Sequence, residues 1–244
     1  MIVDIRGVIA CSRYSFAPNS LHYCGPERQN DMLGYVTGSL ADDGLVEILN
    51  RFETLYPYLV LIASENTIAD PFDYRVVEAY WLGNTLLDRV RVKPFAAHLA
   101  DRVGLKRKIK ANAYTPMMDH LAPSGIPQHT FHVLNIFIRT GHHAISHTLH
   151  TMDECRISWG RVIDTGKQCL VSVRPLIYER DRLRLGKPEK RTVTSVMVTP
   201  KVGDWVSIHW GFVCDILTLK QRMHLAYYTE KAVSSANSSP IHRI

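Results

Sequence analysis

The chain has 244 residues, which is enough for one large domain or two ordinary ones. Its formal net charge is +6, and it contains five cysteines. Its longest apolar run, near residues 58–63, is far shorter than the roughly 18–20 residues of a membrane-spanning helix, and its first residues do not resemble a signal peptide. We therefore expect a soluble, cytoplasmic protein with reduced cysteines. The absence of a CxxC pair argues against a disulfide framework and against a zinc finger.

Basic residues gather at positions 106–110 and 180–191. Neither cluster is interleaved with aromatic residues or set in a helix-turn-helix pattern, so we interpret both as solvated surface. We expect neither a nucleic acid nor a membrane as partner. An acidic protein partner would explain the same charges equally well.

Residues 11–26 contain Pro18, Asn19, Gly25 and Pro26, which predict an irregular segment that packs on the body of the protein. Cys24 and His22 lie within this segment. They could be ligands of a soft metal, but we favour a buried thiol beside an aromatic cluster.

The following residues, up to about position 103, predict an all-α unit. Apolar positions recur every three or four residues from Leu45, and Pro57 should break or kink that helix. Asp70 and Pro71 resemble a helix cap followed by an early proline, and residues 92–103 predict a further helix. Residues 104–125 are basic and then proline-rich, which predicts a connection or a short helix.

Six of the twelve histidines lie between positions 129 and 150. A helix would place His143, His147 and His150 on one face, where they could bind a cofactor or a transition metal. The simpler alternative is a polar helix face whose rings are satisfied by neighbouring groups.

After residue 150 the periodicity becomes that of β-strands. Short runs rich in Val and Ile predict strands at 157–163, 169–173, 176–178, 192–198 and 205–210. So many strands in about 60 residues imply a small barrel. Thr218 and Gln221 form the capping box of a last helix that should end near Lys231. The predicted fold is α+β: a helical domain at 1–150, a β-barrel with its helix at 151–233, and a disordered tail at 234–244.

Two motifs stand out in this second half. CRISWGRV occupies residues 155–162, and VGDWVSIHWGFV occupies residues 202–213. Together they resemble the HypC/HupF family of hydrogenase-maturation chaperones, in which a cysteine precedes a Gly-Lys-Val-like strand by five residues and a Val-Gly-Asp-Tyr-Val-x-Val-His-x-Gly-Phe block follows. The resemblance covers about residues 152–232. The whole chain also resembles an uncharacterised hydrogenase-associated family, which implies no chemistry.

The resemblance implies an OB-like barrel in which Cys155 and His209 match the cysteine and histidine of the HypC/HupF motifs. It further implies a carrier of iron, in the form Fe(CN)2CO, that works with the large subunit of [NiFe]-hydrogenase or with a maturation scaffold protein. A thiolate and an imidazole both suit Fe(II). The chain departs from the family because Cys155 is internal, whereas the family's cysteine becomes the N-terminal residue.

Two other functions remain open. The protein could be an enzyme whose histidine cluster works with a carboxylate such as Glu78, Asp119 or Asp153, although no motif defines a reaction class. It could also be an interaction module in which the barrel carries no metal, with Cys155 and Cys214 as core thiols.

Overall fold

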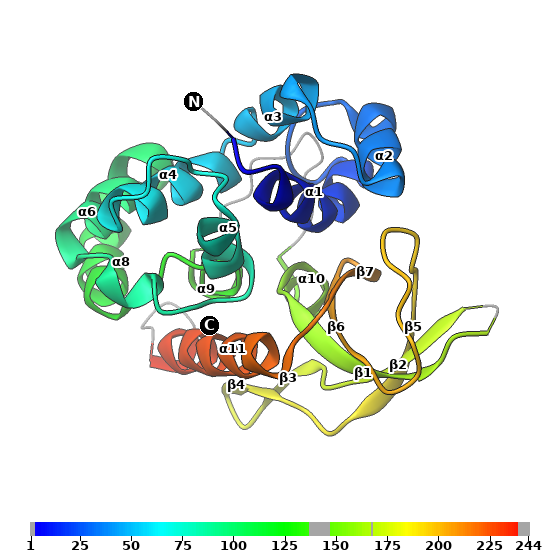
Figure 1. The fold of residues 1–244 in the computed structure, drawn as a ribbon. Helices are drawn as coiled ribbons and strands as arrows, with labels where there is room; N and C mark the ends of the chain where they lie inside the picture. The colour runs from blue at the N-terminus through cyan, green and yellow to red at the C-terminus, as the bar shows by residue number, and fades with distance from the viewer. Residues whose placement is uncertain (1–2, 137–146, 167, 239–244) are drawn as a thin grey trace.

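The computed structural model describes residues 3–136, 147–166 and 168–238. Helices form the first part of the chain, an antiparallel sheet follows, and a long helix ends the described residues (Figure 1). The α+β class and the order of its two parts are as predicted.

The helical part contains ten α-helices and two short helices of other types within the described residues. They are α1 (Ile5–Ser20), α2 (Gln29–Gly38), α3 (Asp43–Asn50), α4 (Leu55–Glu65), α5 (Tyr74–Trp81), η1 (Leu87–Arg89), α6 (Val92–Ala97), η2 (His98–Arg102), α7 (Leu105–Lys108), α8 (Ala111–Ser124), α9 (His129–Asn135) and α10 (Leu149–Cys155). The all-α unit predicted up to about residue 103 is confirmed by the helices from α2 to η2, and three corrections follow.

The first correction concerns α1, which replaces most of the predicted irregular segment. Asp4 caps this helix by accepting a hydrogen bond from the Arg6 backbone. The hydroxyls of Ser12 and Ser15 donate hydrogen bonds to backbone carbonyls of the preceding helical turn. These bonds allow small polar residues on a buried face of the helix. Pro18 lies inside the last turn of the helix rather than ending it. Only the residues after Ser20 are irregular.

The second correction concerns helix boundaries. Pro57 lies in the first turn of α4, where a proline costs little, and the preceding helix has already ended at Asn50. Asp73, not Asp70, caps α5. The Asp70 carboxylate instead accepts hydrogen bonds from the Asp4 and Phe72 backbones and so ties the start of the chain to the turn before α5.

The third correction concerns two helices that are longer than predicted. α8 runs for 14 residues with Pro116 and Pro123 inside it, although its prolines had suggested a connection. The last helix, α11 (Leu219–Ser238), begins at the predicted Thr218–Gln221 capping box and includes residues 234–238 of the predicted tail. Residues 239–244 lie outside the described part of the chain.

The described residues form one five-stranded antiparallel sheet with the order β5-β2-β1-β6-β7 and a separate hairpin, β3–β4. The bounds are β1 (Ser158–Asp164), β2 (Cys169–Val173), β3 (Leu176–Glu179), β4 (Arg182–Leu185), β5 (Glu189–Val193), β6 (Trp205–His209) and β7 (Phe212–Ile216). The sequence analysis did not identify β4 and β7.

The predicted closed barrel is not found in the described residues. The two edge strands meet only at one corner, where Thr194, just after β5, pairs with Phe212 at the start of β7. Two backbone hydrogen bonds of 2.8 Å hold this corner, from Thr194 to Gly211 and from Val213 to Thr194. The sheet is thus strongly curled, but its edges are not joined along their length.

The turn between β6 and β7 explains the His-Trp-Gly-Phe sequence. Trp210 and Gly211 both have positive φ (48° and 73°), as in the two-residue hairpin turn that suits the twist of β-strands. His209 and Phe212 are paired on either side of this turn. The turn therefore fixes His209 at the very end of β6.

One hydrophobic core runs through both parts of the chain. It includes Tyr80 and Leu134 from the helices, Cys214 from the sheet and Leu225 from α11. A second, smaller core lies within the sheet around Val171 and Val206. The predicted boundary near residue 150 therefore crosses a shared core, and the division into domains stays a prediction. No helix in the described ranges is long and apolar enough to cross a membrane.

His98 provides a pH-dependent contribution to stability. Burial, together with the charges of His132 and Arg102, lowers its pKa from 6.5 to about 3. The unfolded chain therefore binds a proton that the folded chain does not, and stability should fall as pH drops from 6.5 towards 3, by about 1.4 kcal/mol per pH unit. In urea titrations, the stability advantage of the wild type over His98→Phe should shrink across this range. A constant difference would contradict the prediction.

Candidate metal centre

Three buried side chains from distant parts of the sequence meet beside the shared core. They are His129, Cys155 and His209, and their candidate ligand atoms all lie within 4.8 Å of one another. Their exposed fractions are only 9%, 6% and 1%. Metal ions bind through a thiolate sulfur and imidazole nitrogens at such mutual separations, so this cluster is a candidate metal centre.

Each of these residues lies at the end of a secondary-structure element. His129 is the first residue of α9, Cys155 is the last of α10, and His209 is the last of β6. Element ends are fixed by the regular structure on one side and are open for contacts on the other. Three different elements therefore place the three side chains of the cluster.

Backbone contacts determine the position of His209. Its Nδ1 lies 2.7 Å from the Tyr14 carbonyl oxygen, which can only accept, so Nδ1 carries the hydrogen. In the neutral ring Nε2 then holds the lone pair, which is the arrangement that metal-binding histidines commonly adopt. The adjacent Trp210 backbone donates to the Glu154 carbonyl at 2.8 Å, and this bond draws the turn onto α10 beside Cys155.

Ion pairs fix the end of α10 that bears Cys155. The Asp153 carboxylate is buried, and it binds Arg156 at 2.7 Å and Arg191 of β5 at 2.9 Å. It also accepts a hydrogen bond from the Leu176 backbone at the start of β3. Burial lowers the pKa of the Arg156 guanidinium, and Asp153 opposes this shift. The residues flanking Cys155 are thus tied to two strands.

His129 is held by contacts to both of its ring nitrogens. Its Nε2 lies 2.8 Å from the Cys155 carbonyl oxygen, and its Nδ1 lies 3.2 Å from the Tyr80 hydroxyl. Burial raises the pKa of Tyr80 well above its ordinary value, so the phenol stays protonated and can donate to Nδ1. Metal binding at either nitrogen would replace one of these two hydrogen bonds.

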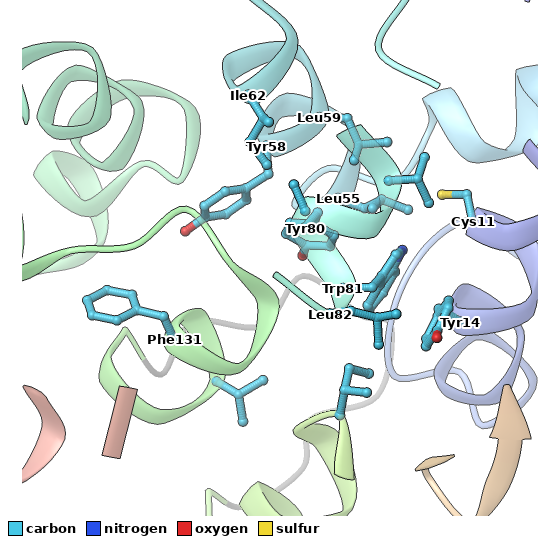
Figure 2. Close-up of a cluster of buried hydrophobic side chains, with 14 of the residues drawn as sticks. Cys11, Tyr14, Leu55, Tyr58, Leu59, Ile62, Tyr80, Trp81, Leu82 and Phe131 are labelled. Atoms are coloured by element: carbon cyan, nitrogen blue, oxygen red, sulfur yellow. The ribbon is translucent and has the colours of Figure 1, made fainter. Parts of the chain in front are cut away.

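Aromatic rings enclose the cluster on the side of the core. The Trp81 ring lies 4.6 Å from that of His129 and 5.6 Å from that of His209, measured between centroids. Figure 2 shows Tyr80, Trp81 and Tyr14 side by side between α5 and α1, with centroid separations of 4.8 and 5.3 Å. These rings exclude water from one side of the cluster and stiffen its surroundings.

A cavity of about 50 Å³ borders all three residues of the cluster. Because a water molecule needs roughly 10–15 Å³ of such space, the cavity has room for a few waters or one small ligand. Its inner wall includes Tyr80 and Trp81, whereas its outer wall includes the half-buried Cys24 and the exposed Glu53. The outer wall connects the cavity with the surface.

The structure brings together the predicted pair of Cys155 and His209. It does not place the predicted triplet of His143, His147 and His150 together on one helix within the described residues. His147 lines the cavity but precedes α10, which begins at Leu149, so no helix aligns it with His150. His150 is exposed on α10. His143 lies outside the described residues.

The other candidates from the sequence have separate surroundings. Glu78, Asp119 and Asp153 do not line the cavity in the described part of the chain. Cys214 is fully buried in the core, as the simpler interpretation had it. Cys24 lines the cavity, while His22 bonds to Gln29 at 3.0 Å.

His129 is the residue that sequence analysis missed. It belongs to the histidine-rich stretch, but it is 26 positions before Cys155 and starts a separate helix. Its only signal was its membership of that stretch. Its role depends on the packing of α9 against α10 and α11, which no local pattern reveals.

The donor set decides which metals suit the cluster. One thiolate and two imidazoles can bind Fe(II), Zn(II), Cu or Ni(II), and the fourth position would face the cavity. The iron that the HypC/HupF resemblance implies fits these residues. Fold and site together define an α+β protein with a buried Cys-His-His cluster.

Comparison with known proteins places the chain in a family. Residues 3–243 match the "Family of unknown function (DUF6390)", and the chain belongs to this family. The match spans both the helical part and the sheet, so the two parts occur together in the family. No curated protein and no solved structure matches the chain.

Proposed function

We propose that this protein is a non-catalytic carrier of iron in the maturation of [NiFe]-hydrogenase, with a HypC-like unit formed by its curled sheet. Its cargo is an iron ion, with cyanide and carbon monoxide ligands as in Fe(CN)2CO. The observation that carries the proposal is the meeting of Cys155 and His209, with His129 beside them, in one buried cluster. Cys155 and His209 are the two residues that match the chaperone motifs.

The chemistry of the cluster agrees with a carrier. Cys155 supplies a soft thiolate and the two histidines supply neutral imidazoles, which together suit Fe(II). Three protein ligands leave other coordination positions for small ligands in the adjoining cavity. The aromatic wall around Trp81 protects such a unit from water. The partner is the hydrogenase large subunit or a maturation scaffold protein, and neither a membrane nor a nucleic acid is required. We assign the cytoplasm as its compartment.

The alternatives have less support. An enzyme built on the histidine stretch has less support because Glu78, Asp119 and Asp153, the carboxylates suggested for it, do not line the cavity, and Glu53, which does, is exposed at the outer wall. A metal-free interaction module would leave the clustering of three buried ligand residues unexplained.

The test is anaerobic purification of the full chain, followed by elemental analysis, infrared spectroscopy and co-purification with a hydrogenase large-subunit precursor. We expect about one iron per chain, cyanide and carbonyl stretches, and association with the precursor. Cys155→Ala should lose the iron, whereas Cys169→Ala, the same change on β2 away from the cavity, should keep it. Wild-type protein that neither contains iron nor associates with the precursor would refute the proposal. Association without metal would favour the interaction module.

A further inference from the structure

The cavity beside the metal centre is bordered by a second thiol. Cys24 lies in the turn after α1, 131 residues before Cys155, yet both side chains line the same cavity of about 50 Å³. Cys24 is therefore part of the cavity that contains the candidate ligands.

The two thiols differ in their access to solvent. Cys155 is 6% exposed, whereas Cys24 is half-buried and shares the outer wall of the cavity with the exposed Glu53. Cys24 therefore lies between the buried cluster and the exposed part of the cavity lining, where an ion on its way to the surface could contact it. Its sulfur is the same kind of soft donor as that of Cys155.

The backbone around Cys24 is held in place rather than loose. The buried Asn19 amide donates to the carbonyls of Cys24 and Pro26 at 2.9 and 2.7 Å. Gly25 has φ of +81°, and an added Cβ there would lie 2.4 Å from the Phe52 ring. The Tyr23 ring packs on Trp210, the residue next to His209, at 4.8 Å between centroids. These contacts fix the turn over the metal centre.

We propose that Cys24 is a transfer ligand, which takes the metal from Cys155 and presents it at the outer wall of the cavity. This inference rests on the proposed carrier function and names the route by which its cargo leaves. The Cys24 thiol loses its proton as its bond to the metal forms. Cys155 takes up one proton as its own bond to the metal breaks, and His129 and His209 release the metal as neutral rings, so the number of protons is unchanged. The oxidation state of the metal does not change.

The experiment uses Co(II) as the probe, because a thiolate–Co(II) charge-transfer band reports the metal–sulfur bond. The full chain is loaded with Co(II), and excess EDTA is then added to measure the rate of release. We expect Cys24→Ser to retain the affinity for Co(II) but to release the metal about tenfold more slowly, which corresponds to a barrier higher by roughly 1.4 kcal/mol. Cys24→Ala should behave in the same way.

The matched control is Cys169→Ser, which should equal the wild type in affinity and in rate. Release from Cys24→Ser at the wild-type rate would overturn the inference while leaving the carrier function intact. Loss of Co(II) binding in Cys24→Ser, with a native circular dichroism spectrum, would also overturn it, because Cys24 would then be a permanent ligand. Wild-type protein that binds no Co(II) would refute the inference together with the metal centre on which it rests.

Discussion

Replacing His129 by glutamine is expected to weaken metal binding about a hundredfold. Structural metal sites with four protein ligands bind with roughly 10–16 kcal/mol, or about 3 kcal/mol per ligand. Glutamine has a similar length, and its amide can still contact the Cys155 carbonyl and the Tyr80 hydroxyl, so the fold should be retained. It is a poor ligand for a soft metal. Competition between the protein and a chelator of known affinity gives the dissociation constant.

The control for this prediction is His150→Ala. His150 belongs to the same histidine-rich stretch but is exposed on α10, so its loss should leave the affinity unchanged. If His129→Gln also binds as tightly as the wild type, Cys155 and His209 hold the metal without His129. If both variants lose affinity for the metal to the same extent, the histidines of this stretch bind metal nonspecifically rather than at one site.

The pairing of Cys155 and His209 could be predicted because both residues lie in short motifs with family-like spacing. The rest of the cluster could not. His129 reaches it only because Gln128 caps α9, accepting from the Phe131 backbone and donating to the Trp81 carbonyl. That contact depends on tertiary packing between α9 and α5. Sequence periodicity describes single elements and contains no information about which of their ends will meet.

Prediction of the fold from the sequence has the same limit, because local patterns describe single elements. Strands β1, β2 and β6 correspond to the runs rich in Val and Ile from which strands were predicted, whereas β4 alternates Arg with Leu and β7 contains Cys214 and Asp215. The helix α1 was missed because Pro18 and Asn19, with Gly25 and Pro26 just beyond the helix, predicted an irregular segment. Its stability comes from burial of Cys11 and Tyr14 against other elements. Closure of the sheet depends on the register between edge strands, which a single sequence does not specify.

The assembly of the site has a physical consequence for the whole molecule. The candidate metal ligands come from α9, α10 and β6, and His209 is oriented by the Tyr14 carbonyl of α1. A metal that binds these three residues only in the folded chain stabilises the folded state by mass action. Metal binding should therefore link the helical part to the sheet, and removal of the metal should lower the stability of both.

Replacing Asp153 by asparagine is expected to cost about 3–5 kcal/mol of unfolding free energy, because it leaves the charge of Arg156 buried without its counter-ion. Arg156 is 1% exposed, and its side chain also donates to the neutral Arg174 carbonyl at 2.7 Å. Asparagine keeps the shape of the side chain and can still accept from the Leu176 backbone. The amide nitrogen that replaces the second carboxylate oxygen cannot accept from Arg191, so the effect reports the lost charge together with the lost Arg191 contact, and thermal unfolding should shift down by roughly 10 °C.

Glu189→Gln is the matched control for this last prediction. Glu189 binds the same Arg191 at 3.0 Å but is half exposed, so its neutralisation should cost about 1 kcal/mol or less. Since α10 ends at Cys155, loss of the ion pairs of Asp153 with Arg156 and Arg191 should also weaken metal binding. A saturating concentration of metal should restore part of the stability that Asp153→Asn loses. If the two variants unfold at the same temperature, the buried ion pairs do not hold α10 in place, and the position of Cys155 must depend on the Trp210–Glu154 hydrogen bond instead.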